Sequence, residues 1–281
     1  MDEFRVDLHC HTTCSDGTLS PEEVIRLAKQ IGLSGLCITD HDTIEAYQFA
    51  IPFSKEIGIE MITGAEFSAS HNGTSVHILA YSFAPDSEVI KNFCHRHIER
   101  RTNRNREILD LLAKNKMPIT EEELAEYSTK AKHTVGRPHI AMAMIKKGYV
   151  SNVKEAFKRY IGDGKPCYAR GQTFTVEYIL DVIHQANGLA IIAHPHLLED
   201  HVTLRYLLEL PFDGIECYYA RFAPDNEKRW LEIAQKKKWL ATGGSDFHGE
   251  IKPTIPLGCS WIGEETFRIL QNHFKNNDSN S

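Results

Sequence analysis

The sequence predicts an α/β fold, in which short apolar strands alternate with amphipathic helices. The first third of the chain follows a strand, helix, strand, helix, strand pattern, and the same alternation returns after residue 167. Between these parts the apolar spacing is helical and no strand is predicted, which indicates an insertion. We therefore expect an α/β domain built from residues 1–90 and 168–281, interrupted by a helical insertion domain at residues 91–167. A chain of 281 residues can form either one barrel or two smaller domains.

The elements can be justified in chain order. The first helix begins at a capping box formed by Ser20 and Glu23 and ends at Gly32. Apolar runs then predict strands at residues 35–39, 60–66 and 75–81, with a helix at residues 44–57. Within the insertion, helices are expected at residues 96–114, after a second capping box at Thr120, and at residues 137–147 and 153–161. Beyond it we expect helices at residues 176–186 and 226–237, and strands at residues 189–193 and 214–218 and from residue 240.

The composition is that of an ordinary globular protein, with 42% hydrophobic and 25% charged residues. The formal net charge of −6 offers no general attraction to nucleic acid or to an anionic membrane, so any phosphate has to be bound by local positive charge. The seven cysteines form no Cys-x-x-Cys pair, which argues against a disulfide framework and a zinc ribbon. No apolar run is long enough to span a membrane and no secretory signal is evident, so we expect a cytoplasmic protein.

Polar residues follow the predicted strands at their carboxyl ends. His9 and His11 occupy positions i and i+2 of the first strand, so their imidazoles project from one face. Alone, such a pair is either a metal half-site or simply two polar residues at a strand end. Because the carboxyl ends of parallel strands converge, the strand-end side chains are expected in one pocket. They are His9, His11, Asp16, His41, Glu66, His77, His194, Asp246 and His248. Six imidazoles and three carboxylates exceed the needs of one ion and suit two or three metals.

Several segments of the chain resemble, in order, the motifs of the polymerase and histidinol phosphatase (PHP) family. They are Asp7-Leu8-His9-Cys10-His11, Ile38-Thr39-Asp40-His41-Asp42, Gly64-Ala65-Glu66, His77-Ile78-Leu79, Ala193-His194-Pro195 and Gly244-Ser245-Asp246-Phe247-His248. Within the insertion, Gly136-Arg137-Pro138-His139-Ile140-Ala141 is similar to the bacterial branch that hydrolyses 3′,5′-nucleoside bisphosphates and trims RNA from its 5′ end. The resemblance covers nearly the whole chain.

The resemblance implies a distorted (β/α)7 barrel with a helical insertion domain and three clustered divalent ions. Manganese is the expected metal, with iron and zinc as alternatives. The family pattern assigns His9, His11, Glu66 and Asp246 to one ion, His77 and His194 together with a bridging Glu66 to a second, and Asp16, His41 and His248 to a third. A hydroxide bridging two ions is then the expected nucleophile.

Two further residues are candidates for catalysis. His196 is placed to donate a proton to the leaving oxygen, and its alternative is a mere surface histidine beside Pro195. Asp40 is a candidate for orienting a metal ligand from behind.

The insertion is expected to recognise the part of the substrate that the metals do not contact. In its first helix, Arg96, Arg100 and Arg104 share a face through their four-residue spacing. Guanidinium groups bind phosphate in a bidentate manner, so a second substrate phosphate is expected there or at the Gly-Arg-Pro-His motif. The candidate substrate-binding residues are Arg100, Arg104, Arg137 and His139. The alternative for the helix is a solvated basic face paired with Glu99 and Glu107.

Three functions compete at this stage. The first is a metal-dependent phosphohydrolase that acts on 3′,5′-nucleoside bisphosphates such as 3′-phosphoadenosine 5′-phosphate and on short 5′-phosphorylated RNA. The second is a histidinol phosphate phosphatase, and the third is an inactive PHP module that serves as a scaffold. A deaminase or amidohydrolase of similar barrel shape is disfavoured by the basic insertion. The expected partners are a small nucleotide and short single-stranded RNA 5′ ends, with no membrane and no obligate protein partner.

Overall fold

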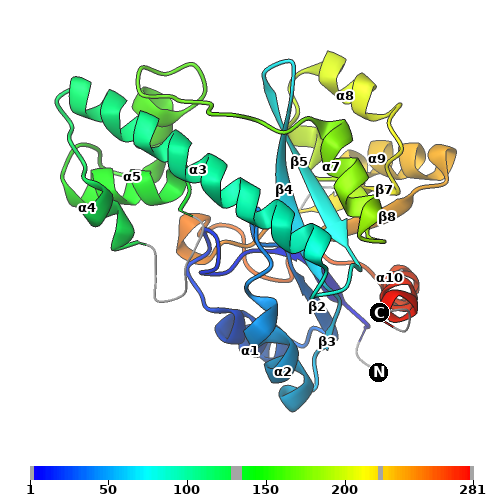
Figure 1. Cartoon of the computed structure of the whole chain (residues 1–281). Helices are drawn as coiled ribbons and strands as arrows, with labels where there is room; N and C mark the ends of the chain where they lie inside the picture. The colour runs from blue at the N-terminus through cyan, green and yellow to red at the C-terminus, as the bar shows by residue number, and fades with distance from the viewer. Residues whose placement is uncertain (1–2, 128–134, 221–223, 279–281) are drawn as a thin grey trace.

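The computed structural model describes residues 3–127, 135–220 and 224–278 and contains two β-sheets flanked by helices (Figure 1). The first sheet is parallel and has the order β1-β2-β3, with bounds Val6–Cys10, Gly35–Ile38 and Glu60–Met61. The second has the order β4-β5-β6-β7-β8, with bounds Gly64–His71, Thr74–Tyr81, Leu189–Ile192, Gly214–Tyr219 and Leu240–Gly244. The α/β class predicted from the sequence is confirmed.

The second sheet is mixed, not parallel. β4 and β5 form an antiparallel hairpin, β5 pairs antiparallel with β6, and β6, β7 and β8 run parallel. The hairpin turns at Asn72 and Gly73, whose φ angles are both positive at 46° and 89°. An Asn-Gly pair in this conformation matches the right-handed twist of the flanking strands, which is why two-residue hairpins favour it.

The single strand predicted at residues 60–66 is wrong. β3 ends at Met61, and the chain enters the second sheet at Gly64, where β4 begins. A Cβ at Gly64 would lie 2.5 Å from Cys37 Sγ. The chain can therefore cross between the sheets at this point only because residue 64 lacks a side chain.

The two sheets meet at both edges through a few backbone bonds. On one side, the Asp246 N–H donates to the His9 carbonyl at 2.7 Å, which joins the end of β8 to β1. On the other, the Asp42 N–H donates to the Glu66 carbonyl at 3.0 Å, which joins the end of β2 to β4. These contacts join the sheets only through isolated bridges, so the structure establishes a mixed α/β fold and does not confirm the predicted barrel. They do bring the polar strand ends together.

The helices cover the outer faces of the sheets. In Figure 1, α1 (Pro21–Gln30) and α2 (Tyr47–Ile57) lie beside the first sheet, whereas α7, α8 and α9 lie beside the second and α10 lies near both ends of the chain. The bounds of these four are Val176–Gln185, His201–Leu207, Pro224–Lys237 and Glu264–Asp278. The capping box of α1 is present as predicted, with Ser20 accepting from Glu23 N–H. Two short 3₁₀ turns, Pro195–Leu197 and Gly249–Ile251, follow β6 and β8.

The segment between β5 and α7 is helical, as expected. It contains α3, α4, α5 and α6, followed by a π-helical turn, with bounds Glu88–Lys114, Glu121–Ala125, Arg137–Lys146, Val153–Ala156 and Phe157–Ile161. A core of its own, which includes Ile108, Leu112, Ile140 and Met144, packs α3 against α5. α3 is 27 residues long and runs diagonally across the front of the molecule in Figure 1.

Candidate active site

The fold brings the nine candidate metal-ligating side chains into one cluster, although Glu66 and His77 lie within the antiparallel strands β4 and β5 and not at the carboxyl ends predicted for them. Ligand atoms in each of three groups lie within 4.8 Å of one another: His9, His11, Glu66 and Asp246; His11, Asp16, His41 and His248; and His41, Glu66 and His77. The ninth residue joins them, since His194 Nε2 lies 2.8 Å from Glu66 Oε1. His11 and His41 each belong to two groups, whereas the family pattern placed each with a single ion.

The backbone is strained where it delivers these residues. His194 and Asp246 hold positive φ angles of 27° and 55°, which residues other than glycine seldom adopt. The close approach of β8 to β1 depends on Gly244, because a Cβ there would lie 2.3 Å from the His9 backbone nitrogen. Strain of this kind persists only when the surrounding structure over-determines it, which is typical of functional sites.

Glu216 of β7 holds two of the histidines in place. Its Oε1 accepts a hydrogen bond from His9 Nδ1 at 2.8 Å, and its Oε2 accepts from the His194 backbone N–H at 2.7 Å. The bond to Nδ1 leaves Nε2 of His9 as the ring nitrogen that faces the cluster. We did not predict Glu216 from the sequence, although a carboxylate within the apolar strand Gly214–Tyr219 was a usable signal.

Asp246 presents its two oxygens to different partners. Its Oδ1 lies 3.2 Å from His11 Nε2, whereas its Oδ2 accepts from the Tyr219 hydroxyl at 2.7 Å and from Lys252 Nζ at 2.6 Å. Tyr219 and Lys252 therefore fix which oxygen faces the cluster. No motif in the sequence marked either of them.

The two catalytic candidates occupy different surroundings. Asp40 accepts from the Thr12 N–H at 2.7 Å and from the Ser15 hydroxyl at 2.6 Å, so it orders the loop that leads to Asp16 and does not bond directly to a ligand imidazole. The His196 ring lies 4.4 Å from the Tyr219 ring, at the edge of the cluster. Burial and the neighbouring His194 lower the pKa of His196 to about 4, which weakens the case for a proton donor at neutral pH.

The chemistry of the cluster fits divalent metal ions. Burial opposes ionisation of Glu66, but His41 and His77 outweigh it and hold the pKa of its carboxyl well below the usual range. Five buried atoms of the cluster make no hydrogen bond within the described structure: His9 Nε2, His11 Nδ1, His11 Nε2, His41 Nδ1 and Glu66 Oε2. Buried polar atoms are normally paired, and imidazole nitrogens and carboxylate oxygens that converge without partners are the donor set that manganese, iron and zinc accept.

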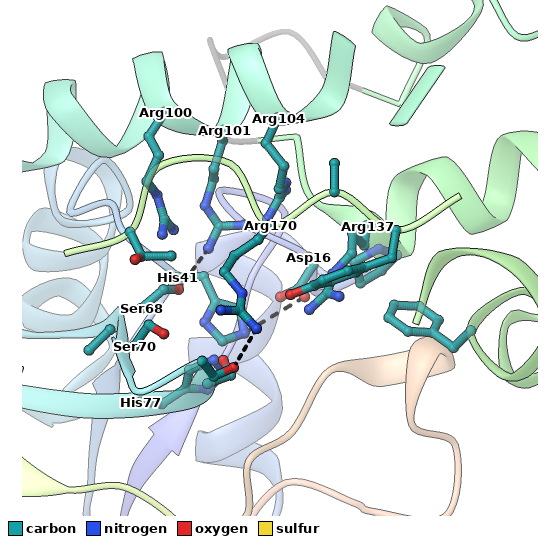
Figure 2. A pocket seen from close by; sticks show the side chains of 18 residues that line it. Asp16, His41, Ser68, Ser70, His77, Arg100, Arg101, Arg104, Arg137 and Arg170 are labelled. Atoms are coloured by element: carbon teal, nitrogen blue, oxygen red, sulfur yellow. Dashed lines mark hydrogen bonds and ion pairs between the residues drawn. The ribbon is translucent and has the colours of Figure 1, made fainter. Parts of the chain in front are cut away.

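A pocket lined by arginines adjoins the cluster (Figure 2). Arg100, Arg101 and Arg104 point into it from α3, above Asp16, His41 and His77 on the opposite wall. Arg137 and Arg170 complete the set of arginines. Of the predicted substrate-binding residues, His139 does not line this pocket, because it is buried and its Nδ1 accepts the Gly136 N–H at the start of α5.

The arginines of the pocket differ in whether a carboxylate of the protein neutralises their positive charge. Arg101 is paired with the buried Asp42 through its Nε at 2.6 Å and through Nη2. Arg137 is paired with Asp163 at 2.7 Å. Arg104 instead has a buried Nε without a partner, and burial together with the positive charge of its neighbours lowers its pKa well below the usual range. An anion in the pocket would relieve this uncompensated charge.

The remaining arginines of α3 lie outside the pocket. Arg106 forms an exposed ion pair with Glu121. The sequence predicted a solvated pair for this face of the helix, but with Glu99 or Glu107 as the partner. Arg96 packs on aromatic rings one helical turn before Arg100. Arg170 was missed because it follows the insertion, outside any motif; it approaches the hairpin turn closely and donates to the Gly73 carbonyl at 2.8 Å.

Comparison with known proteins gives consistent matches. The profile of the PHP domain family matches residues 7–167. A 5′-3′ exoribonuclease of Haemophilus influenzae is 33% identical over 265 residues, which cover 92% of this chain and 92% of that protein. A 3′,5′-nucleoside bisphosphate phosphatase of Chromobacterium violaceum is 29% identical over 249 residues, 87% of each chain. The crystal structure of a Bifidobacterium adolescentis protein described as a metal-dependent phosphoesterase has a TM-score of 0.87 at 29% identity and covers 95% of this chain and 96% of its own.

Proposed function

The chain belongs to the PHP domain family, and from that premise we propose that it releases phosphate from 3′,5′-nucleoside bisphosphates and removes nucleotides from the 5′ end of 5′-phosphorylated RNA. It is a metal-dependent phosphoric ester hydrolase, as its relatives are. One observation carries the substrate assignment: a cluster suited to metal ions forms one wall of a pocket whose other wall presents arginines. A substrate with two phosphates can use both walls at once.

We propose three divalent ions, with manganese as the resident metal and iron or zinc as alternatives. Their ligands are His9, His11, Asp16, His41, Glu66, His77, His194, Asp246 and His248. When bound, the ions lower the pKa of water, supply the attacking oxygen and neutralise charge that gathers on the phosphoryl group. Glu216 maintains the tautomer of His9, and Asp40 maintains the loop that carries Asp16.

The second phosphate is bound by the arginine wall. Arg104 is the principal anchor, because its charge has no carboxylate within hydrogen-bonding distance in the described structure. Arg100, Arg137 and Arg170 surround it. Arg101 has mainly a structural role, since the ion pair with Asp42 already compensates its charge. His139 contributes indirectly by capping α5, the helix that begins with Arg137.

His196 remains the candidate donor of a proton to the leaving oxygen. Its position beside Tyr219 and two residues after His194 supports this role, whereas its lowered pKa opposes it. Replacing His196 by asparagine tests whether it is a proton donor or only a surface histidine. Unchanged turnover at unchanged metal content would eliminate His196 as a donor.

Three broader expectations extend the same proposal. The two sheets together form a distorted (β/α)7 barrel, which the backbone bonds at both of their edges support. Residues 91–167 act as a substrate-recognition domain, as their separate core and their arginines suggest. The protein works in the cytoplasm, which suits its seven free cysteines. In the described part of the chain, no helix has the length and apolar character that crossing a bilayer requires.

The experiment that tests the proposal compares substrates. Purified protein loaded with manganese is given 3′-phosphoadenosine 5′-phosphate, histidinol phosphate or a 5′-phosphorylated RNA, and released phosphate or nucleotide is measured. We expect turnover of the bisphosphate and the RNA at least a hundredfold above that of histidinol phosphate. Preference for histidinol phosphate would support the second candidate function. Absence of turnover on all three with metals bound would support an inactive scaffold.

A further inference from the structure

A platform of two aromatic rings and one arginine lies beside the pocket, with Arg96 and Tyr178 exposed and Phe174 half-buried. Arg96 of α3 packs over Phe174 and Tyr178, with its guanidinium carbon 4.9 Å and 5.0 Å from the two ring centroids. The two rings stack on each other at 5.7 Å with an interplanar angle of 28°. Arg96 also donates to the Tyr178 hydroxyl. We call Arg96, Phe174 and Tyr178 the Arg96 platform.

The platform is held in place from within the fold, and its exposed parts are Tyr178 and the Arg96 guanidinium that covers the two rings. Phe174 packs against the buried Phe93 and His97, with ring centroids 5.1 Å and 4.7 Å away, so its position is fixed from within the fold. Tyr178 is 37% exposed, and Arg96 is exposed as well. Within the described residues, Arg96 has no carboxylate partner, because its contacts are to the two rings.

The platform is continuous with the arginine wall of the pocket. The Arg100 guanidinium carbon lies 5.9 Å from the Phe174 ring, and Arg100 itself lines the pocket. Arg96, Arg100 and Arg104 stand four residues apart, so one arginine follows another about every 6 Å along α3. The three therefore form a row of positive charge from the open surface into the pocket, where Arg100 and Arg104 face the metal-binding wall (Figure 2).

A mononucleotide and an RNA chain make different demands on this surface. In a 3′,5′-bisphosphate the substrate ends at its 3′-phosphate, whereas in RNA the same phosphate continues into the next nucleotide. At the other end of the pocket, Phe157 and Tyr168 already pack against Arg137. The side of α3 that carries Arg96 is open.

We propose that the Arg96 platform binds the nucleotides of single-stranded RNA that follow the cleaved phosphodiester, an inference that rests on the proposed exoribonuclease function. Base stacking on the exposed Tyr178 ring and on the Arg96 guanidinium is independent of sequence, because every base has an aromatic face. Arg96 contributes a contact to an RNA phosphate. This contact depends on the local positive charge of Arg96, so the net charge of −6 on the whole chain does not prevent it. The platform therefore serves RNA and is dispensable for bisphosphates.

The test uses an Arg96→Gln/Tyr178→Ala variant, with Arg106→Gln as a matched control on the same helix. Both are assayed with 3′-phosphoadenosine 5′-phosphate and with a 5′-phosphorylated RNA of ten nucleotides. For the double variant we expect kcat/KM on the bisphosphate within twofold of the wild type, and kcat/KM on the RNA lowered by about 5- to 150-fold, the range that loss of base stacking produces. The Arg106→Gln control should match the wild type on both substrates.

Binding gives a second readout that needs no turnover. Fluorescence anisotropy with the ten-nucleotide RNA should show that Arg96→Gln reduces the slope of log Kd against log salt by about 0.7, the value for one phosphate contact to a single strand. Unchanged RNA binding and cleavage in the double variant would overturn the proposal, and so would an equal loss on both substrates, which would mark a structural role. If the wild type hydrolyses neither substrate, the proposed function fails, and the anisotropy measurement still decides whether the platform binds RNA.

Discussion

Replacing Asp42 by asparagine should destabilise the protein substantially. The Asp42 carboxylate is fully buried and accepts hydrogen bonds from Arg101 Nε at 2.6 Å, from the Ser68 N–H at 2.7 Å and from the Ser68 hydroxyl at 3.0 Å. His97 Nδ1 lies 3.1 Å from Asp42 Oδ1. Asp42 has a φ angle of 58°, and asparagine adopts this left-handed conformation more readily than most residues. Asp42→Asn therefore keeps the backbone conformation, but it removes the charge and replaces one of two accepting oxygens by an amide group that only donates.

The free energy of unfolding is expected to fall because Asp42→Asn leaves the buried Arg101 without its counter-charge. Breaking one partner of a buried ion pair costs about 3–5 kcal/mol. Arg101 is 9% exposed and keeps a bond to the Ser68 hydroxyl, so we expect the lower end, about 3 kcal/mol. At about 2–4 °C per kcal/mol, the melting temperature should fall by roughly 6–12 °C. Circular dichroism on heating and in urea measures both quantities, and Arg106→Gln, which breaks only an exposed pair, should cost less than about 1 kcal/mol.

The effect of Asp42 should also depend on pH. Burial opposes its ionisation, but Arg101 and His97 outweigh burial and hold the pKa of Asp42 well below the ordinary range. A carboxyl whose pKa is lowered on folding stabilises the protein above its unfolded pKa of about 3.9 and loses that contribution as the pH falls through the folded value. The stability gap between wild type and Asp42→Asn should be constant from about pH 5 to 8 and should narrow in stronger acid. A gap below about 1 kcal/mol at pH 7 would refute this account of the Asp42 pair.

Three other changes test the site more locally. Arg104→Ala should raise KM for 3′-phosphoadenosine 5′-phosphate by about 10- to 150-fold through loss of a charged hydrogen bond, with little change on a phosphomonoester lacking a second phosphate; equal effects on both would count against Arg104 as the anchor. Glu216→Gln should weaken metal affinity by about 10- to 100-fold, measured by competition with a chromophoric chelator, because the amide has one accepting oxygen and cannot accept from both His9 and His194. Removal of metal by chelation should abolish phosphate release and lower the melting temperature, and manganese should restore both; full activity after complete demetallation would contradict the proposed cofactor.

Most of the cluster could be predicted from the sequence because its residues follow strands, whereas Glu66 and His77 lie within the antiparallel strands β4 and β5. The apolar runs before His41, His194 and Asp246 mark strands locally, and the convergence of strand ends then places the polar residues together. The capping box at Ser20 was equally local and was found. Short-range patterns thus predicted the side chains that the structure gathers in the cluster and most of the helices.

The supporting contacts could not be predicted because they join distant parts of the chain. Glu216 lies 207 residues from His9, and Asp42 lies 59 residues from Arg101. No short-range pattern in the sequence identifies such pairs, since only the folded sheets bring the two residues together. The exchange between sheets after β3 was also missed, although the Asn72-Gly73 pair is a strong hairpin signal that should have indicated the antiparallel β4 and β5.

The most direct measurement is phosphate release from 3′-phosphoadenosine 5′-phosphate by the manganese-loaded protein, with Asp246→Asn as the paired variant. Asp246 belongs to the cluster through one oxygen and is held by Tyr219 and Lys252 through the other, so the variant disturbs the metal site while the arginine wall stays intact. The account predicts metal-dependent release that falls by at least a hundredfold in the variant. Equal release by both proteins, or release that continues without metal, would contradict it.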